Sequence, residues 1–241
     1  MLDPDSAGRV APTQAAPPPG ELGPHALQIL TTEHWSLLAA RSLVYTEAMS
    51  RTSIFVAALG ASVVALALVA QATDFGTGFV AFALVLLPVV YFLGLVTMVR
   101  LAQVNFEDAR WVQGMNRIRN AYLELAPELE AYFVTSRYDD QAGVLLSSVA
   151  MRRRPPALHA FVTVPGVVAV VDSVVAGAIA GIAMLALDLG TAATLAVGAV
   201  AFLASLGGFA WWAERQIDRY TAELDPLFPT PPTEARAQSV Q

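Results

Sequence analysis

Four long apolar stretches constrain the fold of this chain more than any other feature of its sequence. They are residues 54–70, 79–96, 161–187 and 192–212. Each is close to the length of a helix that crosses a bilayer. All 14 basic residues are arginines, and none lies in these stretches or in the short connectors 71–78 and 188–191. Because positive charge marks the cytoplasmic side of a membrane protein, both termini and the middle segment are expected in the cytoplasm.

Composition narrows the function classes. The chain is 56% hydrophobic and carries a net charge of −6, so it has no basic footprint for nucleic acid. It has no cysteine, which excludes disulfides and thiolate chemistry. Arginine as the sole basic residue, with abundant alanine and valine, indicates a GC-rich bacterial genome. We therefore expect a multi-pass protein of the bacterial inner membrane, with the lipid bilayer as a partner and with no cofactor or metal.

The predicted fold is an all-α integral membrane protein with four transmembrane helices arranged as two helical hairpins. The membrane helices are expected at about 52–71, 78–99, 160–187 and 191–212. The expected regions are a disordered proline-rich tail at 1–23, a first hairpin at 24–126, a cytoplasmic linker region at 127–159, a second hairpin at 160–225 and a disordered tail at 226–241. Tails so rich in proline have too little to bury to adopt a fold.

Both helices of the first hairpin are expected to continue into the cytoplasm. After Pro24, apolar residues recur at spacings of three and four up to Ala48, and the first apolar stretch follows with no Gly or Pro between, which predicts one helix over 24–70. A similar heptad pattern follows the second apolar stretch and ends before Pro127. The two extensions are therefore predicted to pack together as an antiparallel cytoplasmic stalk.

One ion pair is predicted within this stalk. Arg41 lies 13 residues before Ile54, and Asp108 lies 12 residues after Val96. At about 1.5 Å rise per residue, the two side chains reach nearly the same height on neighbouring helices. We therefore expect Arg41 and Asp108 to pair.

Asp172 is the main candidate for a functional residue, because it is the single charged residue inside the four apolar stretches. A central Asp costs about 2.5–3.5 kcal/mol on membrane insertion, and such acids usually face a bundle interior or a water path. Counting from the cytoplasmic side places Ser62 and Pro88 at a comparable depth, with Tyr91 one turn away. We expect a polar cluster of Asp172, its neighbour Ser173, Ser62 and Tyr91.

Two interpretations of Asp172 remain open from the sequence. It either belongs to a cation or proton site, or it is a protonated side chain that holds two helices together through a hydrogen bond. The absence of a second intramembrane charge weighs against an ion-coupled transporter, which usually carries several such groups.

Other motifs have simpler interpretations. Gly177 and Gly181 form a GxxxG pair, expected to pack the third membrane helix on the fourth rather than to form a homodimer seam. Arg152, Arg153 and Arg154 are expected to anchor the topology and to contact lipid headgroups. The pair Asp139–Asp140 is interpreted as a solvated turn in preference to a cation site. No catalytic motif is present, and we expect no enzyme activity.

Two functions from different classes follow. The first is an oligomeric ion-conducting pore, or a small cation or proton pathway, that uses Asp172; in a homo-oligomer this acid would form a ring. The second is a non-catalytic membrane scaffold or regulatory protein that binds a cytoplasmic partner through its stalk. The position of Asp172 discriminates between them: a lumen or a subunit axis favours the pore, and a sealed contact inside one chain favours the scaffold.

Overall fold

The computed structural model describes residues 23–147, 163–222 and 225–232, and within these residues it contains helices and no strand. The helices are α1 (Pro24–Ala72), α2 (Thr77–Leu125), the 3-10 helix η2 (Pro127–Tyr132), α3 (Gln141–Ser147), α5 (Val164–Ala186) and α6 (Gly190–Ala222). The prediction of an all-helical chain is confirmed. The helices α1, α2, α5 and α6 are long and apolar enough to cross a membrane, as the sequence predicted.

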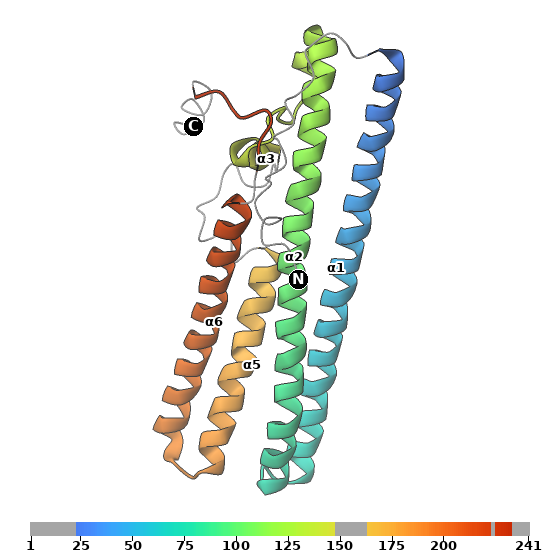
Figure 1. Ribbon diagram of the computed structural model, residues 1–241. Helices are drawn as coiled ribbons and strands as arrows, with labels where there is room; N and C mark the ends of the chain where they lie inside the picture. Colours follow the sequence, from blue (N-terminus) through green and yellow to red (C-terminus); the bar gives the residue numbers. More distant parts are fainter. Residues whose placement is uncertain (1–22, 148–162, 223–224, 233–241) are drawn as a thin grey trace, which may run out of the picture.

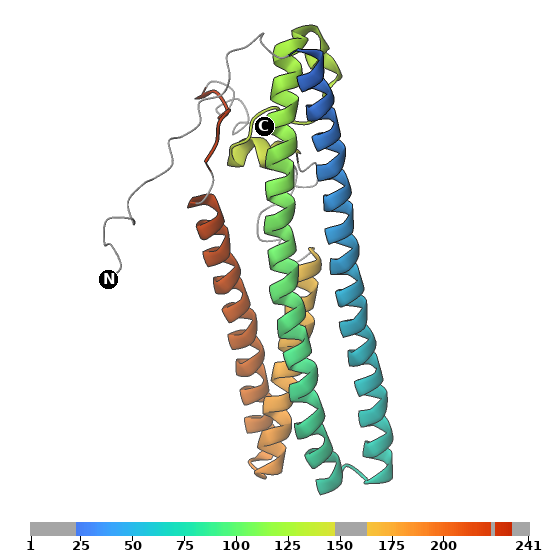
Figure 2. The same ribbon diagram turned by 45° about the vertical axis from the view of Figure 1, so that its right-hand side comes forward.

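The first two helices, α1 and α2, are far longer than a membrane requires. Each has 49 residues, or about 74 Å at 1.5 Å per residue, against a hydrocarbon core of about 30 Å. They lie side by side and run antiparallel (Figures 1 and 2). We call residues 24–51 of α1 and 100–125 of α2, which lie outside the apolar stretches, the distal halves of these helices.

Tight turns join each pair of long helices. Between α1 and α2, Asp74 and Phe75 adopt positive φ angles of 46° and 55°, and the Phe75 N–H donates to the Ala70 carbonyl at 3.1 Å. Between α5 and α6, Asp188 and Gly190 have φ angles of 53° and 79°. Left-handed residues reverse the chain within a few positions, so consecutive helices must lie antiparallel.

Two local features determine where α5 begins, a capping side chain and a proline in the first turn. The Thr163 hydroxyl accepts a hydrogen bond from the Gly166 N–H at 3.3 Å, and Pro165 lies in the first turn, where its missing N–H costs nothing. The helix therefore starts at Val164, four residues later than the start expected at 160.

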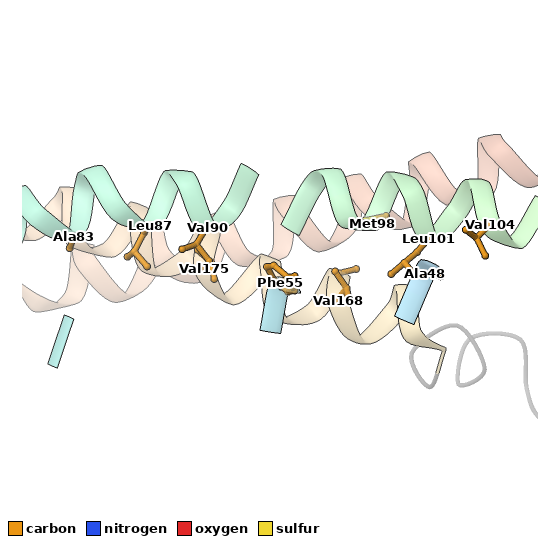
Figure 3. Packing of buried hydrophobic residues seen from close by; sticks show 11 residues of the cluster. Ala48, Phe55, Ala83, Leu87, Val90, Met98, Leu101, Val104, Val168 and Val175 are labelled. Atoms are coloured by element: carbon orange, nitrogen blue, oxygen red, sulfur yellow. The ribbon is translucent and has the colours of Figure 1, made fainter. Parts of the chain in front are cut away.

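The helix α2 is at the centre of the packing. It contacts α1 on one side and α5 on the other, and α6 packs on α5. Figure 3 shows side chains of α2 directed toward α5 and toward the parts of α1 that this view includes. The buried cluster consists of Ala48, Phe55, Ala83, Leu87, Val90, Met98, Leu101, Val104, Val168, Ala169 and Val175. Its members on α1 and α2 extend beyond the apolar stretches into the distal halves.

The helix α6, in contrast to α2, is largely exposed along its most apolar stretch. No residue in its most apolar stretch is buried, although Leu195, Val200 and Leu203 are large and apolar. A helix of this composition would be unfavourable in water and is accommodated by lipid. This exposure agrees with the assignment of α6 as a membrane-spanning helix.

Small residues allow α5 and α6 to approach closely. A Cβ added at Gly177 would lie 2.9 Å from the Gly198 carbonyl oxygen, and one added at Gly198 would lie 3.1 Å from the Gly177 carbonyl oxygen. Gly181 faces Thr194 at ordinary contact distance. The GxxxG pair thus lies against α6 of the same chain.

The region after α2 differs from expectation in detail. Within the expected linker region at 127–159, the described residues form two short helices, η2 and α3. Of the segment expected to be a disordered tail from 226 onward, residues 226–232 instead run along the loop before α3 and bond to it. Residues 1–22, Arg152, Arg153, Arg154 and residues 233–241 lie outside the described residues.

Candidate functional site

Asp172 lies at the contact between α5 and α2. It is fully buried, and its carboxyl group rests directly on Gly94 of α2. A Cβ added at Gly94 would lie 2.0 Å from Asp172 Oδ1 and 2.4 Å from Asp172 Cγ, which no side chain tolerates. The absence of a side chain at Gly94 therefore creates the space that the carboxyl group fills.

Neither carboxylate oxygen of Asp172 has a hydrogen-bond partner among the described residues. An ionised carboxylate removed from water is very unfavourable unless a proton or a cation accompanies it. Buried polar side chains are nearly always bonded, so an exception requires an explanation. The site supplies a buried carboxyl group whose charge has no partner among the residues that the structure describes.

A row of three hydroxyl groups lies beside this site and joins three helices. Ser173 Oγ on α5 donates to Ser205 Oγ on α6 at 3.2 Å or to the Ala169 carbonyl at 2.7 Å. Ser205 Oγ lies 3.3 Å from the Tyr91 hydroxyl on α2. Ser173 directly follows Asp172, and Tyr91 lies one helical turn from Gly94. The hydroxyl row and the carboxyl group therefore occupy adjacent parts of the same contact.

The structure brings some members of the expected polar cluster together and leaves others apart. The structure joins Ser173 to Tyr91, but through Ser205, which the sequence prediction missed. Ser62 Oγ donates instead to the Ala58 carbonyl of its own helix at 2.7 Å, and no bond among the described residues links it to Asp172. Hydroxyl side chains in apolar helices commonly bond to the preceding turn in this way.

The depth expected for Asp172 was also wrong on the α2 side. The residue opposite it is Gly94 rather than Pro88. Counting from the tight turns gives a better register, because Asp172 lies 14 residues before the end of α5 and Gly94 lies 17 after the start of α2. The turns are defined by the backbone, whereas the ends of the apolar stretches far from the turns are defined only by composition.

The distal halves are joined by the Arg41–Asp108 pair. Arg41 Nε lies 2.5 Å from Asp108 Oδ1, and Arg41 Nη2 lies 3.1 Å from Asp108 Oδ2, which is a bidentate arrangement. The side chains are 31% and 14% exposed, so the pair is partly shielded from water. The heptad spacing thus brings together two residues that are 67 positions apart in the sequence.

We expect the Arg41–Asp108 pair to contribute a coupling free energy of about 1 kcal/mol, near the upper end for exposed pairs because the geometry is bidentate. The measurement is a double-mutant cycle with Arg41→Ala, Asp108→Ala and the double variant, by equilibrium unfolding in micelles. Arg51 and Glu47 form a more exposed pair within α1 and serve as the control cycle, with an expected coupling below about 0.5 kcal/mol. Equal coupling in both cycles would contradict the assigned role of Arg41–Asp108.

A charged belt marks the border between the apolar and distal parts of the helices. Arg100 of α2 bonds to Glu47 of α1 and to Glu107 of α2, each at 2.8 Å. These hydrogen bonds, first to Glu47 and then to Glu107, raise the pKa of Arg100 above its usual value. The positive charge of Arg100 is therefore retained at the point where the apolar part of α2 ends.

His34 lies on the face of α1 that packs against α2. Its ring lies 6.2 Å from that of Tyr122, and its Nδ1 atom is buried without a hydrogen-bond partner among the described residues. Burial, and then the positive charge of Arg119, lower the pKa of His34 below its usual value. At neutral pH His34 is thus a neutral, packed side chain of the distal halves.

A second polar site lies at the distal half of α2, where we expected a solvated turn. Asp139 is fully buried, and its Oδ2 atom accepts a hydrogen bond from Arg117 Nε at 2.6 Å. Asn116 is also fully buried and donates to the Tyr138 carbonyl at 2.7 Å. The solvated-turn interpretation of Asp139 is therefore wrong, because burial of this carboxylate is matched by several donors.

The described residues contain no group of three or more His, Cys, Asp or Glu side chains placed to hold a metal ion. In comparisons with family models, with curated proteins and with solved structures, no match to this chain was found. The function therefore has to be argued from the chemistry of Asp172 and of the distal halves.

Proposed function

We propose that this is a membrane protein that binds a proton or small cation at Asp172 and provides a pathway for it through the contact between its two helical pairs. The observation that supports this proposal is a fully buried carboxyl group with neither oxygen bonded among the described residues. Acids inside membrane-spanning helices are costly and commonly mark ion or proton routes.

The geometry favours this interpretation over a purely structural role. A carboxyl group that joins two helices does so by donating or accepting a hydrogen bond across their contact. Asp172 instead meets a glycine on α2, and the bond across the helices is made by Ser173 through Ser205. A merely structural side chain at position 172 would be better apolar.

The contact around Asp172 is sealed inside one chain, which is the arrangement expected of the scaffold and argues against a ring of acids in an oligomeric pore. The ion site proposed here is therefore a site within one chain. A ring of acids requires each carboxyl group to face a shared lumen. Asp172 has no exposed surface in the single chain and is covered by the backbone of α2 at Gly94. Entry of a proton or cation would then require a small separation of α2 and α5, without contribution from a second copy.

The hydroxyl row supplies a route for a proton beside the acid. Tyr91, Ser205 and Ser173 can each donate one hydrogen bond and accept another, so a proton can be passed by reversing the bonds in sequence. In this pathway Asp172 is the group that holds the proton. No bond among the described residues joins this row to Asp172, so transfer between the row and the acid requires a change of rotamer or a bridging water.

The topology in this proposal places the distal halves in the cytoplasm of a bacterial cell. It rests on the arginines, which are absent from the turns at 71–78 and 188–191 and frequent in the rest of the non-apolar sequence. The charged belt around Arg100 would then lie at the cytoplasmic membrane surface. Its pairing with Glu47 holds α1 and α2 together at that level.

We expect purified protein in liposomes to conduct protons, or a small monovalent cation, at a rate that Asp172→Asn lowers at least about tenfold, because the amide retains the shape but cannot carry the proton or charge. The measurement is a trapped pH dye, run in parallel with a sodium dye. Asp188→Asn, which removes an acid in the α5–α6 turn, is the matched control and should conduct normally. Wild-type flux equal to that of empty liposomes would refute the proposal.

A second candidate function is a scaffold that binds a cytoplasmic protein, and one observation favours it. The distal half of α1 exposes an apolar stripe at helical spacing, formed by Leu27, Trp35, Leu38, Tyr45 and Met49. The exposed fraction of Trp35 is 66%. Exposed apolar stripes are typical of interaction surfaces. If the liposomes show no flux, this surface becomes the place to search for function.

A further inference from the structure

Asp139, which is buried, and its half-buried neighbour Asp140 lie in the loop before α3 and bind the main chain of the segment that follows α6. Asp139 Oδ1 accepts from the Phe228 N–H at 2.7 Å, and Asp139 Oδ2 accepts from the Leu227 N–H at 3.0 Å. The Asp139 N–H in turn donates to the Phe228 carbonyl at 3.1 Å. Arg117 bonds both to Asp139 and, at 2.7 Å, to the Asp225 carbonyl.

Asp140 binds the next part of the same segment. Its Oδ2 atom accepts from the Thr230 N–H at 2.9 Å, and its Oδ1 atom accepts from the Thr230 hydroxyl at 2.8 Å. Oδ1 also accepts from the Gly143 N–H at 2.8 Å, which fixes the carboxyl group against the start of α3. Both acids therefore have their oxygens occupied by donors. Charge-assisted bonds of this kind are stronger than neutral ones.

The sequence of the segment matches this pattern of acceptors. Positions 226, 229, 231 and 232 are prolines, which have no N–H to donate. The three remaining N–H groups between 227 and 230 are all bound by Asp139 or Asp140. Prolines also hold a chain extended before it binds, which reduces the entropy lost on binding.

We propose that Asp139, Asp140 and Arg117 form a peptide-recognition site for a proline-containing segment, and that residues 225–232 of this chain are its occupant. We call the site and its occupant the clasp. The clasp ties the chain at the end of α6 to the distal half of α2, far from the α5–α6 contact. It is a second anchor for α6, which has no buried residue in its apolar stretch. The clasp does not depend on the role of Asp172.

The first test measures the distance across the clasp. Because the chain has no cysteine, spin labels can be attached to Asn105→Cys on α2 and Ile217→Cys on α6, both at exposed positions. We expect one narrow distance distribution in the otherwise wild-type chain. Phe228→Pro should broaden it, because it removes an N–H that Asp139 accepts while leaving every residue of the recognition site in place.

The controls separate clasp opening from general damage. Glu130→Gln in η2 removes one exposed acidic charge without touching the clasp, and should leave the distribution narrow. Asp139→Asn should broaden it, as Phe228→Pro does, because the amide cannot accept from both N–H groups and pair with Arg117. A distribution that stays narrow in Phe228→Pro would overturn the proposal.

The second test asks whether the site recognises a peptide. A fluorescent synthetic peptide with the sequence of residues 225–232 is titrated into full-length protein. We expect the Phe228→Pro variant, whose own segment is released, to bind the peptide at least about tenfold more tightly than the wild type, whose site is occupied. Failure of Phe228→Pro to bind the peptide, with its helical content unchanged, would mean that the site does not recognise the segment independently.

Discussion

Gly143→Ala is expected to destabilise the distal end of α2 and to open the clasp. A Cβ at this position would lie 2.0 Å from the Tyr138 carbonyl oxygen and 2.5 Å from its carbon. These are backbone atoms, so the contact cannot be relieved by a change of rotamer. The loop must move, and it carries the Tyr138 carbonyl that Asn116 binds as well as the two acids of the clasp. We expect a loss of about 1–3 kcal/mol in unfolding free energy.

The measurement for Gly143→Ala is equilibrium unfolding in micelles, followed by the Asn105–Ile217 distance described above. Gly114→Ala is the matched control, because the nearest atom to its added Cβ, at 3.1 Å, is the flexible end of Leu37. This variant should lose less than about 1 kcal/mol. If Gly143→Ala is as stable as the wild type, the close packing of α3 on the loop is wrong.

The helical elements were predictable because their signals are local. An apolar stretch with a seam of spacing three and four determines a helix without reference to the rest of the chain. The same periodicity gave the height of Arg41 and Asp108, because both distances were counted along continuous helices from the same pair of membrane boundaries. The structure places these two side chains in contact.

The register between the two helical pairs was not predictable in the same way. It depends on where α5 begins, which Thr163 and Pro165 decide, and on how closely α5 approaches α2 at Gly94. Neither the apolar pattern nor the distribution of charges indicates which residue of α2 lies opposite a given residue of α5. Ser205 was missed for the same reason, although it is the single serine of the fourth apolar stretch.

The clasp shows a different limit of sequence reasoning. Its prolines predict a segment without structure, because a proline-rich segment has little to bury by itself. The acids that bind this segment lie about 90 positions earlier, in a loop without periodicity. The missing signal was the match between the remaining N–H groups and a pair of adjacent acids, and that match becomes visible when the two segments are side by side.

The largest loss of unfolding free energy at the candidate site is expected from Gly94→Ala. Asp172→Ala, at the residue that Gly94 contacts, should instead leave the unfolding free energy unchanged or raise it. The added methyl group at position 94 would lie within 2.4 Å of two carboxyl atoms of Asp172. We expect Gly94→Ala to lose about 1–3 kcal/mol in unfolding free energy. Asp172→Ala removes two buried oxygens that have no partner among the described residues, and this gain offsets the small cavity left behind. That variant should be at least as stable as the wild type, although inactive in the flux assay.

The double variant decides what Asp172 does for the fold. In Gly94→Ala with Asp172→Ala, the methyl group of position 94 enters the space that the carboxyl group has left. The double variant should therefore be more stable than Gly94→Ala alone, with a coupling free energy of at least about 1 kcal/mol in this cycle. An acid kept for structure would give the reverse order, with Asp172→Ala less stable than the wild type because it had lost a bond between helices. An acid kept at a cost in stability has to be explained by the proton or cation that it binds.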